Sequence, residues 1–282
     1  MTVTTPTEAV QQFYDTHPIN EQQIIEKLKR DGHDPLAVSE DILQDYDQDH
    51  FGGVAANDRL ALMAAIDTGS HVLDVCCGMG GPSRYLAHNY GCRVTGIDLS
   101  ASRIDGAKRL TRIAGLDDRV SFEIANALKM PFEDRTFDVV ISQEAFCHIP
   151  EKRRLTSQCF RVLKPGGRIA FTDILTTDRT RPDTEIRLGR EMTFQELGSA
   201  AGYRDALAEA GFEGVVMQDI GDQWRKILTG RLEMYRRLRD QTAERFGQTH
   251  FEKWDSAYAF FVGLYDTGEL GGGRFVAYRP AQ

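Results

Sequence analysis

The clearest chemical pattern in this sequence is an acid followed by closely spaced glycines. Asp74 lies in the apolar run "HVLDV" at 71–75, and Gly78 and Gly80 follow it in "CCGMGG". Glycine lets a backbone turn tightly and approach a ligand closely. A helix that begins near Gly81 would add unpaired N–H groups and partial positive charge. The pattern therefore predicts a nucleotide-type pocket beyond the end of a strand.

The glycine loop departs from the two common phosphate-binding patterns. A dinucleotide fingerprint reads GxGxxG, but Ser83 stands where the third glycine would be, and the loop lacks the GK[ST] ending of a P-loop. An acid at Asp74, ahead of Gly78, suits a ligand that carries an amino group and no pyrophosphate. Asp98 ends the next apolar run, "VTGIDLS", where a carboxylate can accept hydrogen bonds from both ribose hydroxyls.

Strand-like and helix-like stretches alternate between residues 71 and 175, and they must position these side chains. Alternation of this kind predicts βαβ units and an α/β fold with a doubly wound parallel sheet. The expected strands are 71–75, 92–100, 119–126, 137–144 and 167–175, and the expected helices are 81–90, 101–116 and 150–163.

The flanking regions divide the chain into three predicted parts. Residues 1–70 form a polar, helical N-terminal segment that covers the active site, with helices at 8–17 and 20–30. Residues 71–175 form the ligand-binding core. Residues 176–282 form a helical lid and the final strands of the sheet. Within this last part we expect two short helices in 193–212, strands at 213–220 and 271–280, and a long helical stretch over 222–265.

Residues 71–175 resemble the class I S-adenosylmethionine-dependent methyltransferases. The matching segments are "LDVCCGMGG", "VTGIDLS", "ANALKMPFEDRTFDVVISQEAFCHI" and "RVLKPGGRIAFTDIL", in the family's order. The segment "DQDHFGGVAANDRLA" is similar to the N-terminal segment that leads into the core in small-molecule members, including sarcosine/dimethylglycine-type N-methyltransferases. The resemblance implies a Rossmann-like sheet of seven strands and S-adenosylmethionine as the cofactor, with S-adenosylhomocysteine as its product.

The resemblance also implies which residues hold this methyl donor. Family members often have Asp at position 126; the Asn found here can still accept a hydrogen bond through its amide oxygen. The implied contacts run from the methionine part (Asp74, Gly78, Gly80) through the ribose (Asp98) to the adenine (Leu99, Asn126, Ala127), with Gln143 under the donor.

Two residues near the ends of the later strands are candidates for the chemistry. His148, in "QEAFCHIP", is the candidate general base, and some O-methyltransferases of the family use a His at the matching place. Asp173, in "FTDIL", is placed to orient His148 or to bind an amine; a purely structural role is the alternative for both. The candidate contacts to the methyl acceptor are His50, Glu144, Cys147 and Trp224.

Aromatic and basic side chains of the predicted lid allow two interpretations each. The aromatics can form a cage for a cationic amine, or they can simply pack in the core. The basic residues between Arg225 and Arg245 alternate with apolar ones at helical spacing. They form a solvated helix face or contact an anionic group of a substrate or a neighbouring subunit. The lid aromatics are Tyr203, Trp224, Tyr235, Trp254, Tyr258, Phe260, Phe261 and Tyr265.

The five cysteines predict reduced thiols rather than a disulfide framework or a metal site. Their number is odd, their spacing is irregular and no CxxC pair occurs. The adjacent Cys76 and Cys77 have poor geometry for holding one tetrahedral metal, so we expect them to pack as small apolar side chains. Metal binding or redox work by this pair is the alternative.

Composition limits the classes of partner. The net charge is −8 and the pI is near 5.4, which argues against a nucleic-acid binder. The start of the sequence lacks the pattern of a secretory leader, and we expect no membrane span. We therefore predict a cytoplasmic protein that acts on a small molecule, with a homodimer as the candidate assembly.

The predicted function is methyl transfer from S-adenosylmethionine to a small molecule. Transfer to nitrogen or oxygen is the first expectation, and transfer to carbon, for example of an isoprenoid, is the alternative. A dinucleotide-dependent oxidoreductase and a non-catalytic donor-binding module are the competing classes. Many chemistries share this kind of fold, so the sequence leaves the acceptor unnamed.

Overall fold

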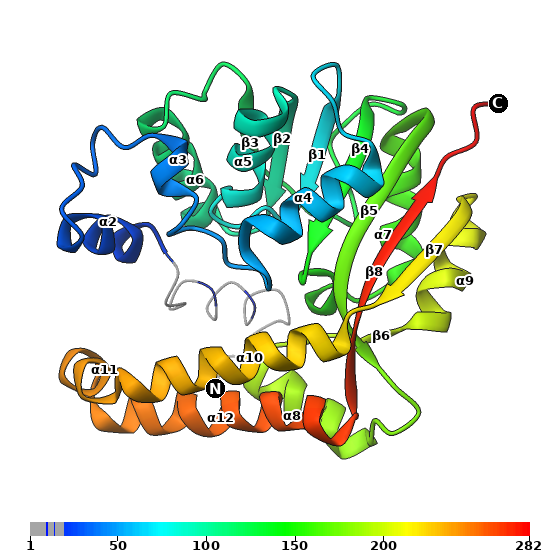
Figure 1. The fold of residues 1–282 in the computed structure, drawn as a ribbon. Coiled ribbons are helices and arrows are strands. Elements are labelled where there is room, and N and C mark those ends of the chain that lie inside the picture. The colour runs from blue at the N-terminus through cyan, green and yellow to red at the C-terminus, as the bar shows by residue number, and fades with distance from the viewer. Residues whose placement is uncertain (1–9, 11–13, 15–19) are drawn as a thin grey trace, which may run out of the picture.

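The computed structural model describes Val10, Tyr14 and residues 20–282. Strands and helices alternate through the middle of the chain, as predicted, and the last third is mainly helical (Figure 1). The elements are α2 (Glu21–Arg30), α3 (Glu40–Leu43), α4 (Gly53–Ala64), β1 (His71–Val75), α5 (Gly81–Tyr90), β2 (Arg93–Asp98), α6 (Ala101–Ile113), β3 (Val120–Ile124), β4 (Phe137–Gln143), the 3₁₀ turn η1 (Phe146–His148), α7 (Lys152–Val162), β5 (Leu163–Thr176), α8 (Pro182–Met192), β6 (Gly198–Ser199), α9 (Ala200–Ala210), β7 (Glu213–Asp219), α10 (Gly221–Arg237), α11 (Arg239–Phe246), α12 (Gln248–Thr267) and β8 (Leu270–Tyr278).

The strands form one mixed sheet whose main path is β3-β2-β1-β4-β5-β8-β7. The five strands from β3 to β5 run parallel, while β8 is antiparallel to both β5 and β7. The two-residue strand β6 pairs with β5 outside this path, so the sheet has eight strands where seven were expected. The predicted α/β class and doubly wound, Rossmann-like sheet are confirmed.

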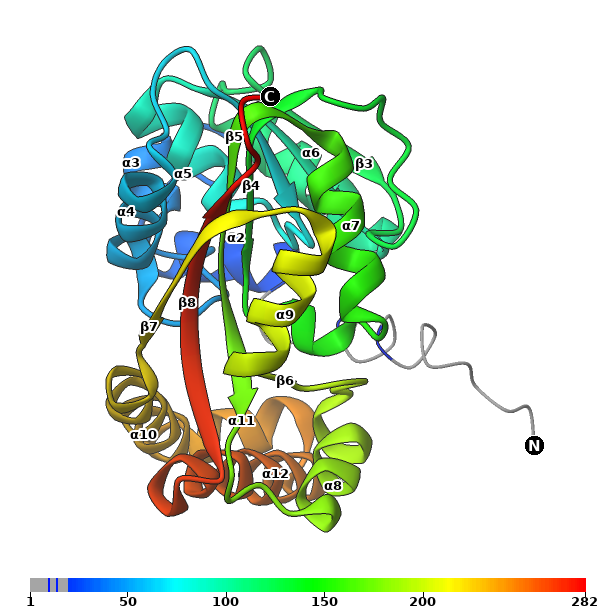
Figure 2. The same cartoon turned by 90° about the vertical axis from the view of Figure 1, so that its right-hand side faces the viewer.

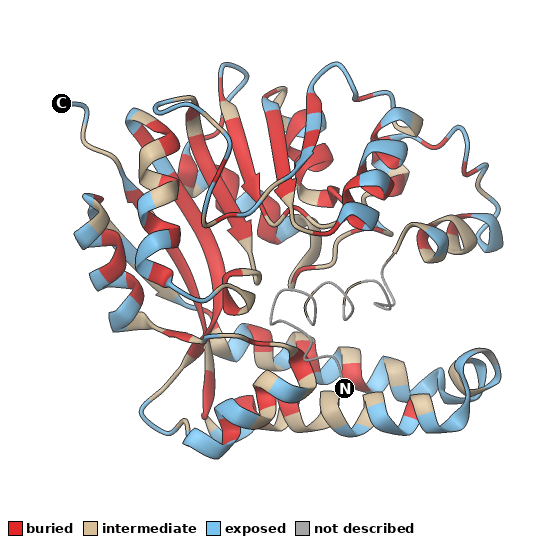
Figure 3. Cartoon of the chain, turned by 180° about the vertical axis from the view of Figure 1, so that it is seen from behind, coloured by how far each residue is buried: buried red, intermediate tan, exposed pale blue. Residues whose placement is uncertain are grey.

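Both faces of the sheet are buried, which explains why its strands are nearly continuous apolar runs. Neighbouring residues of β4 serve opposite faces: Val139 packs with α4, α5 and α6, and Val140 packs with α7 and α9. Figure 2 shows α4 and α5 on one side of the sheet and α7 and α9 on the other. Seen from behind, the central strands are almost entirely buried (Figure 3).

The lid helices α8, α10, α11 and α12 form a separate layer at one end of the sheet (Figure 1). Their own apolar core includes Trp224, Leu228 and Phe261 and joins the sheet through Ile174 and Leu270. The predicted long helical stretch over 222–265 is present as three helices, α10, α11 and α12, because the chain bends at Leu238 and again at Gly247, whose φ is 92°. Glycine reaches such a φ without the steric cost of a Cβ atom.

Two other local predictions are corrected or partly supported. Residues 193–212 contain one helix, α9, instead of two; Ser199 caps it by accepting a hydrogen bond from the Gly202 backbone N–H. The helix predicted at 20–30 is present as α2, capped by Asn20. The helix predicted at 8–17 falls mostly outside the described residues. The three-part division at residues 70 and 175 stays a prediction.

In the described part of the chain, no helix is both long enough and apolar enough to cross a bilayer.

Candidate active site

A cavity of about 1040 Å³ opens where β1, β2 and β4 end, and lid and N-terminal residues complete its walls. Ligands of open α/β sheets bind at this edge. Ten of the predicted donor-binding, catalytic and acceptor-contact residues line the cavity: His50, Asp74, Gly78, Asp98, Leu99, Asn126, Ala127, Gln143, Glu144 and His148.

The loop between β1 and α5 is shaped by three left-handed backbone positions. Cys76, Gly78 and Gly80 have φ values of 63°, 54° and 77°. Gly78 lines the cavity, whereas Gly80 does not. A Cβ atom at Gly80 would lie 2.5 Å from Cζ of Phe122, so packing against Phe122 is what requires a glycine there.

Asp98 is held in place by the backbone on both sides of it. One carboxylate oxygen accepts a hydrogen bond from the Gly78 N–H at 3.0 Å, and the other accepts one from the Ser100 N–H at 2.9 Å. Each oxygen keeps a further lone pair. The carboxylate is therefore oriented at the cavity wall with capacity to accept two hydroxyl groups.

Asp74 lies deeper, near Asp98. The Ser83 hydroxyl donates to its carboxylate at 2.6 Å. Burial, and to a smaller extent the negative charge of Asp98, raise the pKa of Asp74 to about 7. Ser83 stands at the position where a dinucleotide fingerprint has its third glycine. The residue that breaks that pattern thus binds the acid that precedes the loop.

The opposite wall of this half of the cavity comes from Leu99, Asn126 and Ala127. The Asn126 amide oxygen accepts a hydrogen bond from the Leu128 N–H at 2.8 Å, which leaves the amide nitrogen of Asn126 as the donor side of the group. Ala127 is buried beside it. A flat ring bound here would contact the apolar side chains of Leu99 and Ala127 and the polar amide of Asn126.

Gln143 and His50 form the floor where β4 ends. His50 Nδ1 is 2.9 Å from Nε2 of Gln143, and His50 Nε2 is 2.9 Å from Oε1 of Gln48. Burial lowers the pKa of His50 to about 4, so its ring is neutral. An amide oxygen can only accept, so Nε2 of His50 donates to Gln48 and Nδ1 accepts from Gln143. The amide oxygen of Gln143 remains as an acceptor.

Glu144 occupies a strained position next to this floor. Its φ of 46° is uncommon for a residue with a side chain and is typical of functional sites. Thr172 and the Phe51 N–H donate to its two carboxylate oxygens, both at 2.5 Å. Burial raises the pKa of Glu144 to about 7.

The raised pKa of Glu144 predicts how the stability of the fold depends on pH. The folded protein binds a proton at Glu144 that the unfolded chain has lost, so this stabilising contribution fades as the pH rises from about 4.5 to about 7. Glu144→Gln removes that dependence. Across pH 5 to 8, the unfolding free energy of the wild type should fall relative to the variant by about 1–3 kcal/mol. Parallel urea titrations measure this, and parallel pH curves would contradict it.

His148 lies at the end of η1 and forms a hydrogen bond through each of its two ring nitrogens. Its Nδ1 is 3.1 Å from the Thr193 carbonyl oxygen, which can only accept, so Nδ1 carries the hydrogen. Its Nε2 is 2.8 Å from the Tyr14 hydroxyl and, in the neutral ring with the hydrogen on Nδ1, accepts from it. Burial raises the pKa of Tyr14 well above its usual range, so the phenol is neutral. His148 and Tyr14 both line the cavity, and the Tyr14 hydroxyl lies against Nε2 of His148.

Four of the predicted contacts lie behind the cavity wall. Asp173 is fully buried and accepts hydrogen bonds from the Tyr203 hydroxyl at 2.6 Å and the Cys147 N–H at 3.2 Å; His148 is oriented by Thr193 instead. Burial raises the pKa of Asp173 to about 6. The residues that do not line the cavity are Gly80, Cys147, Asp173 and Trp224.

Trp224 and Cys147 pack in the lid core. Trp224 lies edge-on to Phe51, with ring centroids 5.1 Å apart, and crosses the backbone of Gly272 so closely that a Cβ there would be 2.4 Å from its ring. The Cys147 thiol is buried, and burial raises its pKa well above the usual range. Their positions favour structural roles over acceptor contact.

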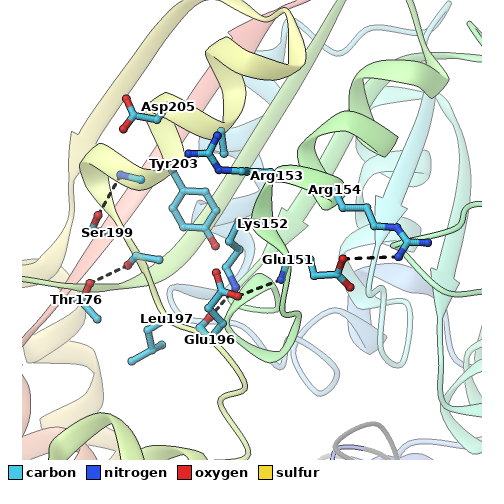
Figure 4. Close-up of a pocket in the computed structure, with 13 residues that line it drawn as sticks. Glu151, Lys152, Arg153, Arg154, Thr176, Glu196, Leu197, Ser199, Tyr203 and Asp205 are labelled. Carbon is cyan, nitrogen blue, oxygen red and sulfur yellow. Dashed lines mark hydrogen bonds and ion pairs between the residues drawn. The ribbon is translucent and has the colours of Figure 1, made fainter. Parts of the chain in front are cut away.

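A second cavity, of about 590 Å³, is lined by the start of α7, the segment that leads into β6, and α9 (Figure 4). The ammonium group of Lys152 projects there and donates to the carbonyl oxygens of Phe146, Ile149 and Glu196 at 2.9, 2.5 and 2.5 Å. All three of its N–H groups are used. Lys152 therefore links the loop that carries His148 to the segment between α8 and β6.

Sequence reasoning missed Tyr14 and did not single out Arg231. Arg231 on α10 donates to the His50 carbonyl oxygen at 2.7 Å and lines the cavity. The alternation of basic and apolar residues on α10 was the available signal for Arg231. Tyr14 carried none, since a tyrosine in a polar helical segment has no distinguishing spacing.

No metal-ion site is evident in the part of the chain that the structure describes: no cluster there brings together three or more His, Cys, Asp or Glu side chains suited to a metal. All five cysteines are free.

The chain matches known proteins along this region. Residues 73–171 match the family model described as "Methyltransferase domain". The chain is 33% identical over 198 residues to the 27-O-demethylrifamycin SV methyltransferase of Amycolatopsis mediterranei, covering 69% of this chain and 73% of the relative. It is 32% identical over 228 residues to phosphoethanolamine N-methyltransferase 3 of Arabidopsis thaliana, covering 81% of this chain and 46% of the relative.

A solved structure shares the fold. Phosphoethanolamine N-methyltransferase 2 of Haemonchus contortus, in complex with phosphomonomethylethanolamine and S-adenosylhomocysteine, aligns with a TM-score of 0.76 and 22% identity, covering 96% of this chain and 60% of that one. The chain spans about half the length of several curated relatives that it matches. It belongs to the family of S-adenosylmethionine-dependent methyltransferases.

Proposed function

We propose that this protein transfers a methyl group from S-adenosylmethionine to a small-molecule acceptor, most readily to nitrogen or oxygen. The observation that carries the proposal is that an oriented acid, Asp98, and a candidate general base, His148, line the same cavity. Family membership supports the reaction class.

The residues present suit the proposed donor. Asp98 would bind the ribose hydroxyls through its remaining lone pairs, and the Gly78 backbone would lie against the methionine part. Leu99, Asn126 and Ala127 would flank the adenine, and the Gln143 amide oxygen would face an amino group. When bound, S-adenosylmethionine supplies a methyl group on a sulfonium, which is an excellent leaving group.

The protein's own contribution is alignment and proton removal. The acceptor would be held in line with the donor in a cavity whose walls restrict water. An acceptor that loses a proton would pass it to the Tyr14 oxygen while the Tyr14 hydroxyl proton moves to Nε2 of His148. Thr193 holds the other ring nitrogen and stabilises the imidazolium that results.

Asp98→Ala should weaken S-adenosylmethionine binding about 10- to 100-fold, because a hydrogen bond to a charged group contributes about 1.5–3 kcal/mol. Isothermal titration calorimetry measures the change. Asp118→Ala is the matched control: this side chain is 73% exposed and pairs only loosely with Arg119, so donor affinity should stay the same. Unchanged affinity in Asp98→Ala would remove Asp98 from the donor site.

The decisive experiment for the reaction is S-adenosylhomocysteine release across a panel of small amines, phenols, thiols and prenyl diphosphates. Release that depends on one class would name the nucleophile, and release with a prenyl diphosphate would favour transfer to carbon. A protein that does not bind the donor would overturn the proposal. Cytoplasmic location and a homodimer remain predictions; free cysteines support the first, and sedimentation measures the second.

A further inference from the structure

Arg231 differs from Arg103, the other arginine along the cavity wall, in having no carboxylate partner among the described residues. Arg103 pairs with Asp49 at 2.5 Å. Within the described residues, Arg231 forms no ion pair; its Nη2 donates to the His50 carbonyl oxygen, and its guanidinium carbon lies 5.3 Å from the Phe51 ring centroid. A guanidinium has five N–H donors. Arg231 binds the His50 carbonyl oxygen and the Tyr258 hydroxyl, so N–H donors remain for a ligand in the cavity that Arg231 lines.

Glu144 does not neutralise Arg231 directly. Glu144 feels the charge of Arg231, but Thr172 and the Phe51 N–H bind its two oxygens and burial raises its pKa to about 7. An anionic ligand group would complete the environment of Arg231. Guanidinium groups bind carboxylate and phosphate oxygens in a bidentate manner, which adds strength and direction.

An apolar wall extends from Arg231 along the same face of α10. Met234 and Leu238 follow it at helical spacing and line the cavity while exposing 51% and 40% of their surface. Trp254 and Tyr258 of α12 line the cavity opposite them. Because this wall is continuous with the donor half of the cavity, a molecule bound beside the donor can extend along it.

The cavity is also large for one compact ligand. Its volume of about 1040 Å³ lies at the upper end of the range of about 300–1,000 Å³ for small-molecule pockets. The proposed donor residues lie along the sheet edge, at or just after the ends of β1, β2, β3 and β4. The lid half therefore offers room, apolar surface and one uncompensated positive charge.

We propose that the acceptor is amphipathic: a carboxylate or phosphate group pairs with Arg231, and an apolar or aromatic body lies along Met234 and Leu238. This inference rests on the proposed function and names the substrate class of the same site. It favours an acceptor with an extended apolar part over a compact amine.

The test uses the full chain loaded with S-adenosylhomocysteine and four probes measured by calorimetry: dodecanoate, dodecyl phosphate, the neutral dodecanamide and butyrate. We expect at least one long anion to bind about tenfold or more tightly than dodecanamide, and the same anion to bind more tightly than butyrate. Comparing dodecanoate with dodecyl phosphate separates the two anionic groups.

Matched variants identify the residues responsible. Arg231→Gln should abolish the preference for the anion over the amide, whereas Arg236→Gln, on the same helix and paired with Asp255 at 2.7 Å, should keep it. Met234→Gln should weaken the long probes by about three- to tenfold. Ile186→Gln, at a residue 70% exposed on α8 away from the cavity, should leave them unchanged.

The outcomes separate this inference from the proposed function. Failure of S-adenosylhomocysteine to bind overturns the proposed function itself. If it binds, the inference is overturned by equal affinity for dodecanamide and both long anions, by no binding of any probe, or by an anion preference that survives in Arg231→Gln.

Discussion

His148→Ala is expected to lower kcat by about 10²- to 10⁴-fold while leaving the affinity for S-adenosylmethionine unchanged. The reason is the ring geometry: Nδ1 is committed to the Thr193 carbonyl, so Nε2 is the basic nitrogen, and it lies 2.8 Å from the Tyr14 hydroxyl. The measurement is S-adenosylhomocysteine release with an acceptor found in the panel, alongside donor calorimetry.

Two companion variants sharpen this test. Tyr14→Phe keeps the aromatic ring but removes the hydroxyl that bridges to His148, so kcat should also fall, with its dependence on pH altered. His88→Ala is the matched control, because His88 pairs with Asp41 on the surface, away from the cavity. Full turnover in His148→Ala would return this residue to a structural role.

Arg84→Met should lower the free energy of unfolding by about 3–5 kcal/mol, because it leaves a buried acid without its counter-charge. Arg84 is fully buried, and its Nη2 contacts Asp47 at 2.6 Å and the Met79 carbonyl at 2.8 Å. Its Nη1 donates to Thr111 at 3.0 Å. Urea denaturation followed by circular dichroism measures the loss.

The effect of Arg84→Met should reach the site as well. Asp47 also accepts from Gln48, which in turn binds His50 at the cavity floor. Donor affinity should therefore fall in the protein that remains folded. Arg109→Met is the control, since its pair with Glu21 is exposed and worth about 1 kcal/mol or less. A loss of similar size in both variants would contradict a special role for the buried arginine.

How much of the site follows from the sequence depends on how local each contact is. Asp74, Gly78 and Asp98 line the cavity as predicted. Each lies at or just after the end of a parallel strand, and such ends meet at one edge of a sheet whatever surrounds it. Position along a strand was therefore sufficient to bring them to the same cavity.

Position near a strand end did not predict the cavity lining where the residue packs into the core. Asp173 lies in β5 and faces Tyr203 of α9 instead of the cavity. Gly80 is in the loop but packs against Phe122 of β3. In both cases, the environment of the residue is set by a side chain from another element, Tyr203 or Phe122. The sequence around the residue does not indicate which side chain that will be.

The sequence by itself determined the α/β class, the order of the central elements and the placing of Asp74, Gly78 and Asp98 at one cavity, because buried apolar runs and turn residues act through local physics. Only the tertiary structure decided the acceptor half. The Tyr14–His148 contact joins residues 134 apart, and the Arg231–His50 contact joins residues 181 apart. Such contacts form only when the lid and the N-terminal residues meet over the sheet, so their geometry comes from packing and not from any one segment.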